Sequence, residues 1–134
     1  IAKPMTAIAI MQLVEQGKIE LDVPIQTYLN DYPRKPEGDI TVRHLLGHVS
    51  GTPYYANKKE GFPSMHFNTL DDAIDLFKNR PLKSKPGTAY LYSTYGYTIL
   101  GSIIEKVTGQ QYADYMKELV WTVLPQSVPL VQEK

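Results

Sequence analysis

The sequence predicts a mostly α-helical chain, and three observations lead to that prediction. Four segments, 3–16, 69–77, 94–107 and 110–121, carry apolar residues at the spacing of an α-helix. Residues that begin or end helices stand at their borders, such as Gly17. Few stretches show the alternation of apolar and polar residues that is typical of a strand.

Length and composition allow one globular domain or a part of one. The chain has 134 residues, of which 43% are hydrophobic and 21% charged. Lys plus Arg and Asp plus Glu both number 14, so no basic excess favours nucleic acid or an anionic membrane. There is no cysteine, which excludes a disulfide framework, a thiolate zinc site and a cysteine nucleophile. No stretch approaches the roughly 20 apolar residues of a membrane span. A small molecule or a peptide is therefore the expected partner.

The first element is a largely buried helix over 3–16. It is apolar on most sides through Met5, Ile8, Ala9, Ile10, Met11, Leu13 and Val14. Pro4 is tolerated only near a helix start, so we expect the first turn at or just before Ile1. Gly17 is expected to end this helix.

The middle of the chain is predicted to be more irregular. Residues 21–29 indicate an extended piece and a short helix, and Thr41 can cap a second short helix that contains Val42, Leu45 and Leu46. Residues 49–68 are rich in Gly, Pro, Asn, Ser and Tyr and predict a long loop, which is usually functional or mobile.

Three further helices complete the prediction. Thr69 with Asp72 resembles a capping box at the start of a helix over 69–77. The helix over 94–107 is stopped by Gly109, and the last helix covers 110–121. Residues 122–134, with two prolines and no clear pattern, are expected to form an irregular tail.

The segment from Lys85 to Gly101 carries the most chemical information. It has a Pro86-Gly87 turn, a short extended piece with Tyr92-Ser93-Thr94, and a helix start with Gly96. The backbone would therefore position Tyr92 at a junction. From these residues alone, a core tyrosine with its hydroxyl bound to a carbonyl is the other interpretation.

Three blocks in order resemble the family of class C beta-lactamases, DD-peptidases and related esterases. They are Gly17-Lys18-Ile19-Glu20-Leu21-Asp22, Ile40-Thr41-Val42-Arg43-His44-Leu45-Leu46-Gly47-His48-Val49-Ser50-Gly51, and Pro86-Gly87 with Tyr92-Ser93-Thr94-Tyr95-Gly96-Tyr97 and Leu100-Gly101. The resemblance covers residues 1 to about 120. It implies the helical lobe of an α/β beta-lactamase/transpeptidase-like fold. The motif Tyr92-Ser93-Thr94 is similar to that of the mitochondrial serine beta-lactamase-like proteins and their bacterial relatives.

The resemblance also implies the site residues. Ile1-Ala2-Lys3 looks like the end of a Ser-x-x-Lys motif whose serine directly precedes Ile1. Residues i and i+3 share a helix face, so Lys3 could reach that serine and also favour the phenolate of Tyr92. Lys3 and Tyr92 are thus the expected catalytic residues, and Tyr92 is the expected general base. Thr94 takes the place of the family's substrate-binding asparagine, which favours an ester or peptide over a beta-lactam.

The histidines and Ser50 are not expected to form a metal site or a second catalytic site. His44, His48 and His66 lack metal-ligand spacing, and we expect His44 and His48 to be structural. Ser50 is not expected to act as a nucleophile with His48, because neighbours two apart do not face each other on a helix or turn. No cofactor and no metal is expected. Gly96 and Gly101 are expected to allow close helix packing.

Two functional hypotheses follow. In the first, the chain is part of a serine hydrolase whose nucleophile and sheet lobe lie outside it, and it is inactive by itself. In the second, it is a non-catalytic helical module that binds a protein or peptide through residues 49–68. The family implies a periplasmic or extracellular location, and the oligomeric state stays open.

Overall fold

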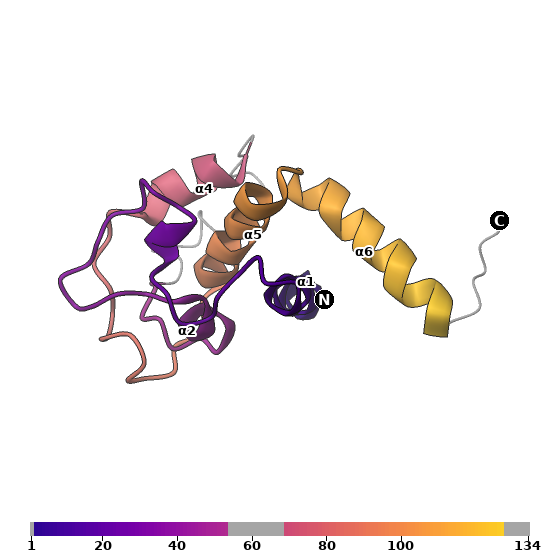
Figure 1. Ribbon diagram of the computed structural model, residues 1–134. Helices are drawn as coiled ribbons and strands as arrows, with labels where there is room; N and C mark the ends of the chain where they lie inside the picture. The colour runs from indigo at the N-terminus through magenta and orange to yellow at the C-terminus, as the bar shows by residue number, and fades with distance from the viewer. Residues whose placement is uncertain (1, 54–68, 128–134) are drawn as a thin grey trace.

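The chain folds into helices joined by long irregular connections, as a computed structural model shows (Figure 1). The structure describes residues 2–53 and 69–127, with side chains for 4–53 and 69–120. The elements are α1 (Ala2–Glu15), the 3₁₀ turn η1 (Ile25–Thr27), α2 (Val42–Leu46), α4 (Leu70–Phe77), α5 (Thr94–Thr108) and α6 (Tyr112–Ser127). No strand occurs in these ranges, although Pro24 and Thr41 form an isolated antiparallel bridge. The prediction of a mostly helical chain is confirmed.

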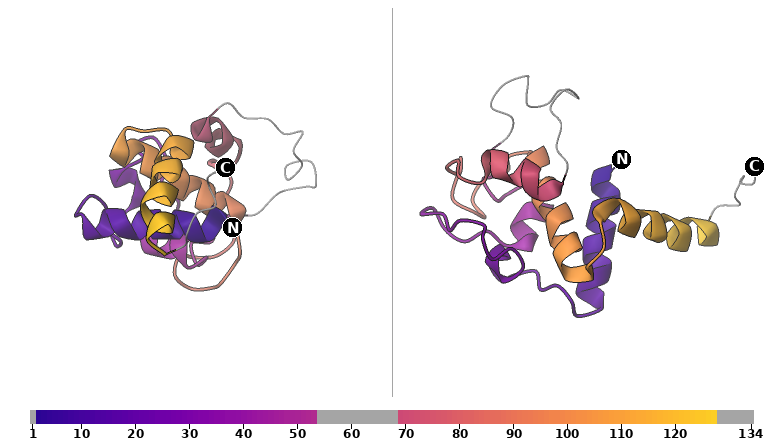
Figure 2. Two further views of the ribbon diagram at one scale, coloured as in Figure 1. Left: turned by 90° about the vertical axis from the view of Figure 1, so that its right-hand side faces the viewer. Right: turned by 90° about the horizontal axis from the view of Figure 1, so that it is seen from above.

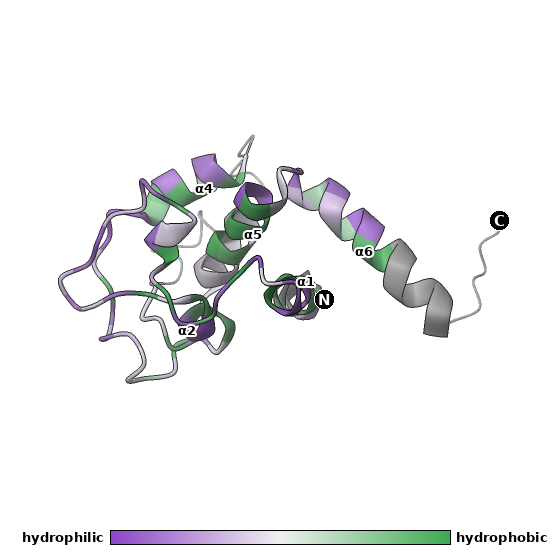
Figure 3. Cartoon of the chain, in the orientation of Figure 1, coloured by the Kyte–Doolittle hydropathy of each residue, from purple (hydrophilic) through white to green (hydrophobic). Residues whose placement is uncertain are grey.

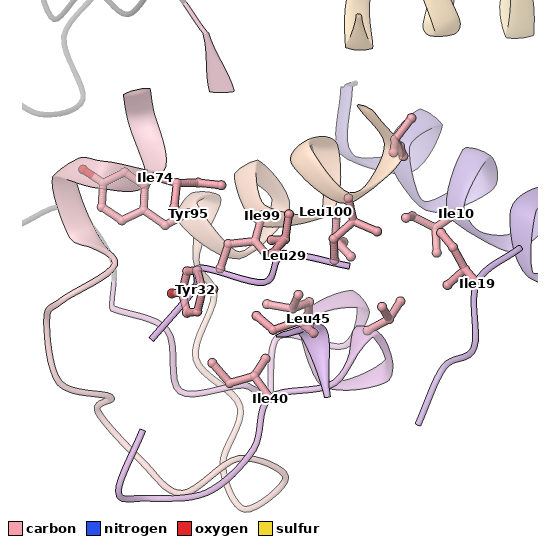
Figure 4. Packing of buried hydrophobic residues seen from close by; sticks show 14 of the residues in the cluster. Ile10, Ile19, Leu29, Tyr32, Ile40, Leu45, Ile74, Tyr95, Ile99 and Leu100 are labelled. Atoms are coloured by element: carbon pink, nitrogen blue, oxygen red, sulfur yellow. The ribbon is translucent and has the colours of Figure 1, made fainter. Parts of the chain in front are cut away.

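Helix α5 is the centre of the molecule. It packs against α1, α2, α4 and α6. Its Ile99, Leu100, Ile103 and Ile104 are fully buried, and Figure 4 shows the first two in the core. Apolar side chains from α1, α2 and α4 close around it, for example Ile10, Leu13, Leu45 and Ile74. Helix α4 turns hydrophobic residues toward α5 and hydrophilic residues outward (Figure 3). Because α5 is apolar on most sides, it is stable only when other elements pack around it, which explains its central position.

The predicted helix borders agree with the structure at four places. Gly17, with φ 78°, follows α1, and Gly109, with φ 73°, is the C-cap of α5. Thr41 and Thr69 cap α2 and α4, and their hydroxyls accept hydrogen bonds from the third residue of each helix. Gly101 lies where a Cβ would stand 3.0 Å from a methyl carbon of Leu70 and 3.4 Å from the ring of Tyr112. The helices therefore approach closely at Gly101, as expected.

The end of α6 differs from the prediction. The helix continues to Ser127 instead of ending near residue 121, and Pro125 lies in its last turns. A proline there lacks only one backbone N–H bond and does not stop a helix that is about to end. The expected irregular structure of 122–127 is thus wrong, and residues 128–134 lie outside the described residues. Figures 1 and 2 show α6 extending away from the other helices.

His44 completes the cap of α2. Its Nδ1 accepts a hydrogen bond of 3.1 Å from the backbone N–H of Thr41, in the place that Glu or Gln takes in a capping box. A nitrogen that accepts must be unprotonated. Burial is the main cause that lowers the pKa of His44 below its usual value, and Arg43 lowers it further while Asp22 opposes the shift.

The chain should therefore lose stability in mild acid through His44. The unfolded chain binds a proton at His44 near pH ~6.5, whereas the native chain binds it only at lower pH. The free energy of unfolding is then highest above that pH and falls as the pH drops through the lowered native pKa. Urea titrations between pH 7.5 and 4.5 measure this slope. His44→Gln keeps an acceptor at this position and should flatten the slope; an equal slope in both proteins would exclude His44 as its source.

Candidate active site

Residues 48–51, which follow α2, and residues 83–91, which precede α5, run side by side. The backbone N–H of Lys83 donates to the carbonyl of Gly51 at 2.8 Å, and that of Gly87 donates to Val49 at 2.7 Å. The backbone N–H of Leu91 donates to His48 at 2.7 Å. The residues that follow α2 thus hold residues 83–91 in place. They position the chain that leads to Tyr92.

Ser93 fixes the start of α5 directly after Tyr92. Its Oγ accepts from the backbone N–H of Gly96 and donates to the carbonyl of Pro53 at 2.9 Å. Ser93 is buried, with 2% of its surface exposed, whereas Tyr92 is 50% exposed. Tyr92 therefore does not have the core position that the other interpretation of the sequence required. It stands half in solvent at a junction set by backbone bonds.

The ring of His48 contacts the rings of three tyrosines. It stacks on Tyr92 at 4.7 Å and 28°, and on Tyr97 at 5.2 Å and 26°. Tyr90 meets its edge at 5.8 Å. The Nδ1 atom of His48 accepts from the backbone N–H of Ser93 at 3.2 Å. Hydrogen bonds and aromatic contacts together tie His48 to the segment that carries Tyr92.

A hollow of about 180 Å³ lies beside this cluster. Its walls are Thr6 of α1, Leu70 of α4, Thr94, Tyr97, Thr98 and Gly101 of α5, and Tyr112 of α6. Thr94, the expected substrate-binding residue, is the first residue of α5 and faces this hollow. The walls combine hydroxyl groups with apolar surface, which suits a small ligand that carries both. The hydroxyls of Thr6 and Tyr112 are hydrogen-bonded to each other and join α1 to α6.

Lys3 lies in the first turn of α1, and its side chain lies outside the described ones. It precedes Thr6 by three residues, so the two share one face of the helix. Since Thr6 and Thr94 line the same hollow, that face of α1 turns toward the start of α5. The backbone thus brings the Lys3 position to the side of the molecule that carries Thr94. Catalytic roles for Lys3 and Tyr92 stay predictions.

Ser50 has a buried position, as expected of a structural residue. Ser50 is 3% exposed, and its Oγ is hydrogen-bonded to Thr52 at 2.7 Å, so it is no accessible nucleophile. Among the side chains of 4–53 and 69–120, no group of three His, Asp or Glu could hold a metal ion. No helix within residues 2–53 and 69–127 is long and apolar enough to cross a membrane. His66 and most of the 49–68 loop of the binding-module hypothesis lie outside the described residues.

The sequence did not reveal that His48 and Tyr97 belong to the surroundings of Tyr92. His48 was expected to be structural, and its hydrogen bond with Ser93 agrees with that, but its stacking on Tyr92 was not foreseen. The available signal was its place one residue after Gly47, at the end of a short helix. A residue at such a place often has a positive φ, which turns its side chain in an unusual direction.

Comparison with known proteins identifies relatives across the whole chain. The beta-lactamase family model matches residues 1–127. The human mitochondrial serine beta-lactamase-like protein LACTB is 27% identical, over 100% of this chain and 38% of its own length. Esterase EstB of Burkholderia gladioli is 32% identical over 90% of this chain and 34% of its own length. A penicillin-binding protein of Bacillus halodurans has a similar structure, with a TM-score of 0.74 and 36% identity over 90% of this chain and 37% of its own.

These comparisons confirm the expected fold and add a fact about length. The likeness to the Bacillus halodurans protein establishes the beta-lactamase/transpeptidase-like fold for the part of it that this chain covers. The chain spans little more than a third of the length of each of the three proteins.

Proposed function

This chain belongs to the beta-lactamase family, a family of serine hydrolases, and we propose that it supplies one wall of the active site of such an enzyme. The reaction is acyl transfer from an ester, a D-alanyl peptide or a beta-lactam to a serine, followed by hydrolysis. The observation that carries the proposal is the half-exposed Tyr92, two residues before Thr94, which lines the hollow.

Each residue has a defined part in the proposed reaction. The serine hydroxyl attacks the carbonyl carbon of the substrate, and its proton passes to the oxygen of Tyr92. The ammonium group of Lys3 stabilises the phenolate form of Tyr92. Tyr92 then gives the proton to the leaving group, and water releases the acyl group from the serine. The nucleophile is the serine of a Ser-x-x-Lys motif that ends at Lys3.

Thr94 determines which substrates suit this site. Its hydroxyl has one proton to donate, whereas the amide of an asparagine can donate two and accept as well. A shorter side chain in the wall of the hollow leaves more room for the acyl group. We therefore favour small esters and peptides over beta-lactams as substrates. The esterase among the relatives agrees with this preference.

The rest of the proposed enzyme covers a surface that is apolar here. Ile8 and Met11 of α1 are large apolar residues, and each is 41% exposed. They lie three residues apart, so they are neighbours on one face of the helix. Exposed large apolar side chains that are neighbours mark a surface for contact with another part of a protein. We assign this face to the sheet lobe of the proposed enzyme.

Covalent labelling tests the proposal. A protein that contains this chain with its flanking sequence should react with an ester-type fluorophosphonate probe, and mass spectrometry should find the adduct on the serine directly before Ile1. The chain by itself should stay unlabelled, because the proposed nucleophile is outside it. No adduct in the longer protein, or an adduct on Ser50 or Ser93, would contradict the proposal.

A further inference from the structure

His48 holds three consecutive residues by three different contacts. Its backbone carbonyl accepts the N–H of Leu91 at 2.7 Å, and its Nδ1 accepts the N–H of Ser93 at 3.2 Å. Between these two bonds, its ring stacks on Tyr92 with centroids 4.7 Å apart. We propose that His48 is a positioning residue that fixes the direction of the Tyr92 phenol for proton transfer. The proposal rests on the proposed role of Tyr92 as general base.

The backbone of His48 has a conformation that few residues adopt. Its φ is 58°, the only positive φ among the non-glycine residues of the described ranges. It follows Gly47, the C-cap of α2, at the place where helices commonly have glycine. A histidine in this region is strained, and such strain persists where other contacts compensate for it. In this conformation both the carbonyl and the ring of His48 reach residues 91–93.

The ring of His48 is itself held firmly. Tyr97 stacks on it at 5.2 Å, and the hydroxyl of Tyr97 donates to the carbonyl of Leu46 at 2.9 Å. Burial, with a smaller effect from Tyr92, raises the pKa of Tyr97 above its usual value, so this phenol stays neutral and keeps its proton for that bond. The imidazole is thus fixed by α2 and α5 together. It can serve as a rigid support.

Tyr92 needs such a support because burial does not provide one. Half of its surface is exposed, so core packing restricts its ring less than it restricts the ring of a buried tyrosine. A general base must stand within hydrogen-bond reach of the proton it takes, and a displacement of about 1 Å can cost roughly 10²-fold in rate. The stack on His48 restricts the ring of Tyr92, and half of the surface of Tyr92 stays exposed.

Two substitutions separate the two functions of the His48 side chain. Asn tolerates a positive φ, and its Oδ1 can accept the N–H of Ser93, so His48→Asn removes the ring and keeps the acceptor. His48→Phe keeps the ring and removes the acceptor. Tyr90→Phe is the matched control, because it changes a 69% exposed tyrosine that touches only the edge of the same imidazole.

The measurements are kcat and KM for a chromogenic ester, and the NMR shifts of a ¹³C-labelled Tyr92 ring, in the protein that contains this chain with its flanking sequence. We expect His48→Asn to lower kcat roughly 10- to 100-fold with KM changed less than about threefold. The shifts of Tyr92 should move toward those of free tyrosine. His48→Phe should lower kcat less and keep the stacked shifts, and Tyr90→Phe should match the parent.

The outcomes distinguish this proposal from the proposed function. If Tyr92→Phe leaves kcat unchanged, the general-base role fails, whatever His48 does. If Tyr92→Phe abolishes turnover but His48→Asn keeps both the parent kcat and the parent shifts, the positioning role alone is overturned. If His48→Asn does not fold, His48→Phe decides: a loss of kcat as large as that of Tyr92→Phe contradicts the proposal, and a small loss with stacked shifts supports it.

Discussion

Tyr92→Phe is expected to lower kcat roughly 10³-fold in the protein that contains this chain with its flanking sequence. The substitution removes only the hydroxyl oxygen, which is the atom that would take the proton of the serine. The phenyl ring can still stack on His48, and Tyr92 contributes little to the core because it is half exposed. The melting temperature and KM should therefore stay close to those of the parent. Steady-state hydrolysis of an ester substrate measures the loss.

The control for this prediction is another exposed tyrosine of the same segment. Tyr90→Phe also removes one hydroxyl, two residues away, and should leave kcat within about twofold. Equal and large losses in both variants would point to a disturbed segment and not to a lost base. An unchanged kcat in Tyr92→Phe would remove Tyr92 from the mechanism.

Gly51→Ala is expected to destabilise the chain by about 3 kcal/mol or more. A Cβ at this position would stand 2.2 Å from the carbonyl oxygen of Ser84, which belongs to the backbone and cannot turn aside. Gly51 also has φ 82°, a region that costs a residue with a side chain roughly 1–2 kcal/mol. Relief of the clash requires residues 83 and 84 to move, which would break the bond between Lys83 N–H and the Gly51 carbonyl.

Gly17→Ala is the matched control for Gly51→Ala. Gly17 has a similar φ of 78°, but nothing lies within 4 Å of the Cβ that alanine would add. It should therefore show only the conformational cost, about 1 kcal/mol. Urea unfolding of the two variants gives the difference. Equal losses of stability would mean that the close approach of residues 51 and 84 is not what demands glycine at position 51.

Local signals in the sequence were sufficient to predict the helices. Thr41 and Thr69 accept hydrogen bonds from residues three positions later, and such short-range bonds depend on little else. The end of α6 was missed because 122–134 show no clear pattern and contain two prolines, whereas a proline in the last turns removes only one hydrogen bond. Local chemistry thus predicted the ends that Gly17 and Gly109 mark, and it failed at α6, where no glycine follows residue 121.

The surroundings of Tyr92 could be predicted only in part. The motif pointed to Tyr92 and Thr94, and the structure has Tyr92 half exposed and Thr94 at the start of α5. The role of His48 could not be read from the sequence, because it depends on a backbone conformation and on bonds to residues more than forty positions away. The hollow likewise forms only where four helices meet.

The separation between Tyr92 Oη and Lys3 Nζ tests the central claim most directly. It should be measured in a crystal structure of the protein that contains this chain with its flanking sequence, with a phosphonate bound to the nucleophile. The account predicts a hydrogen bond of about 2.6–3.2 Å between these atoms, with the serine oxygen within the same reach of Tyr92 Oη. A Tyr92 hydroxyl that points away from Lys3, with no water between them and with the serine in contact with another base, would contradict it.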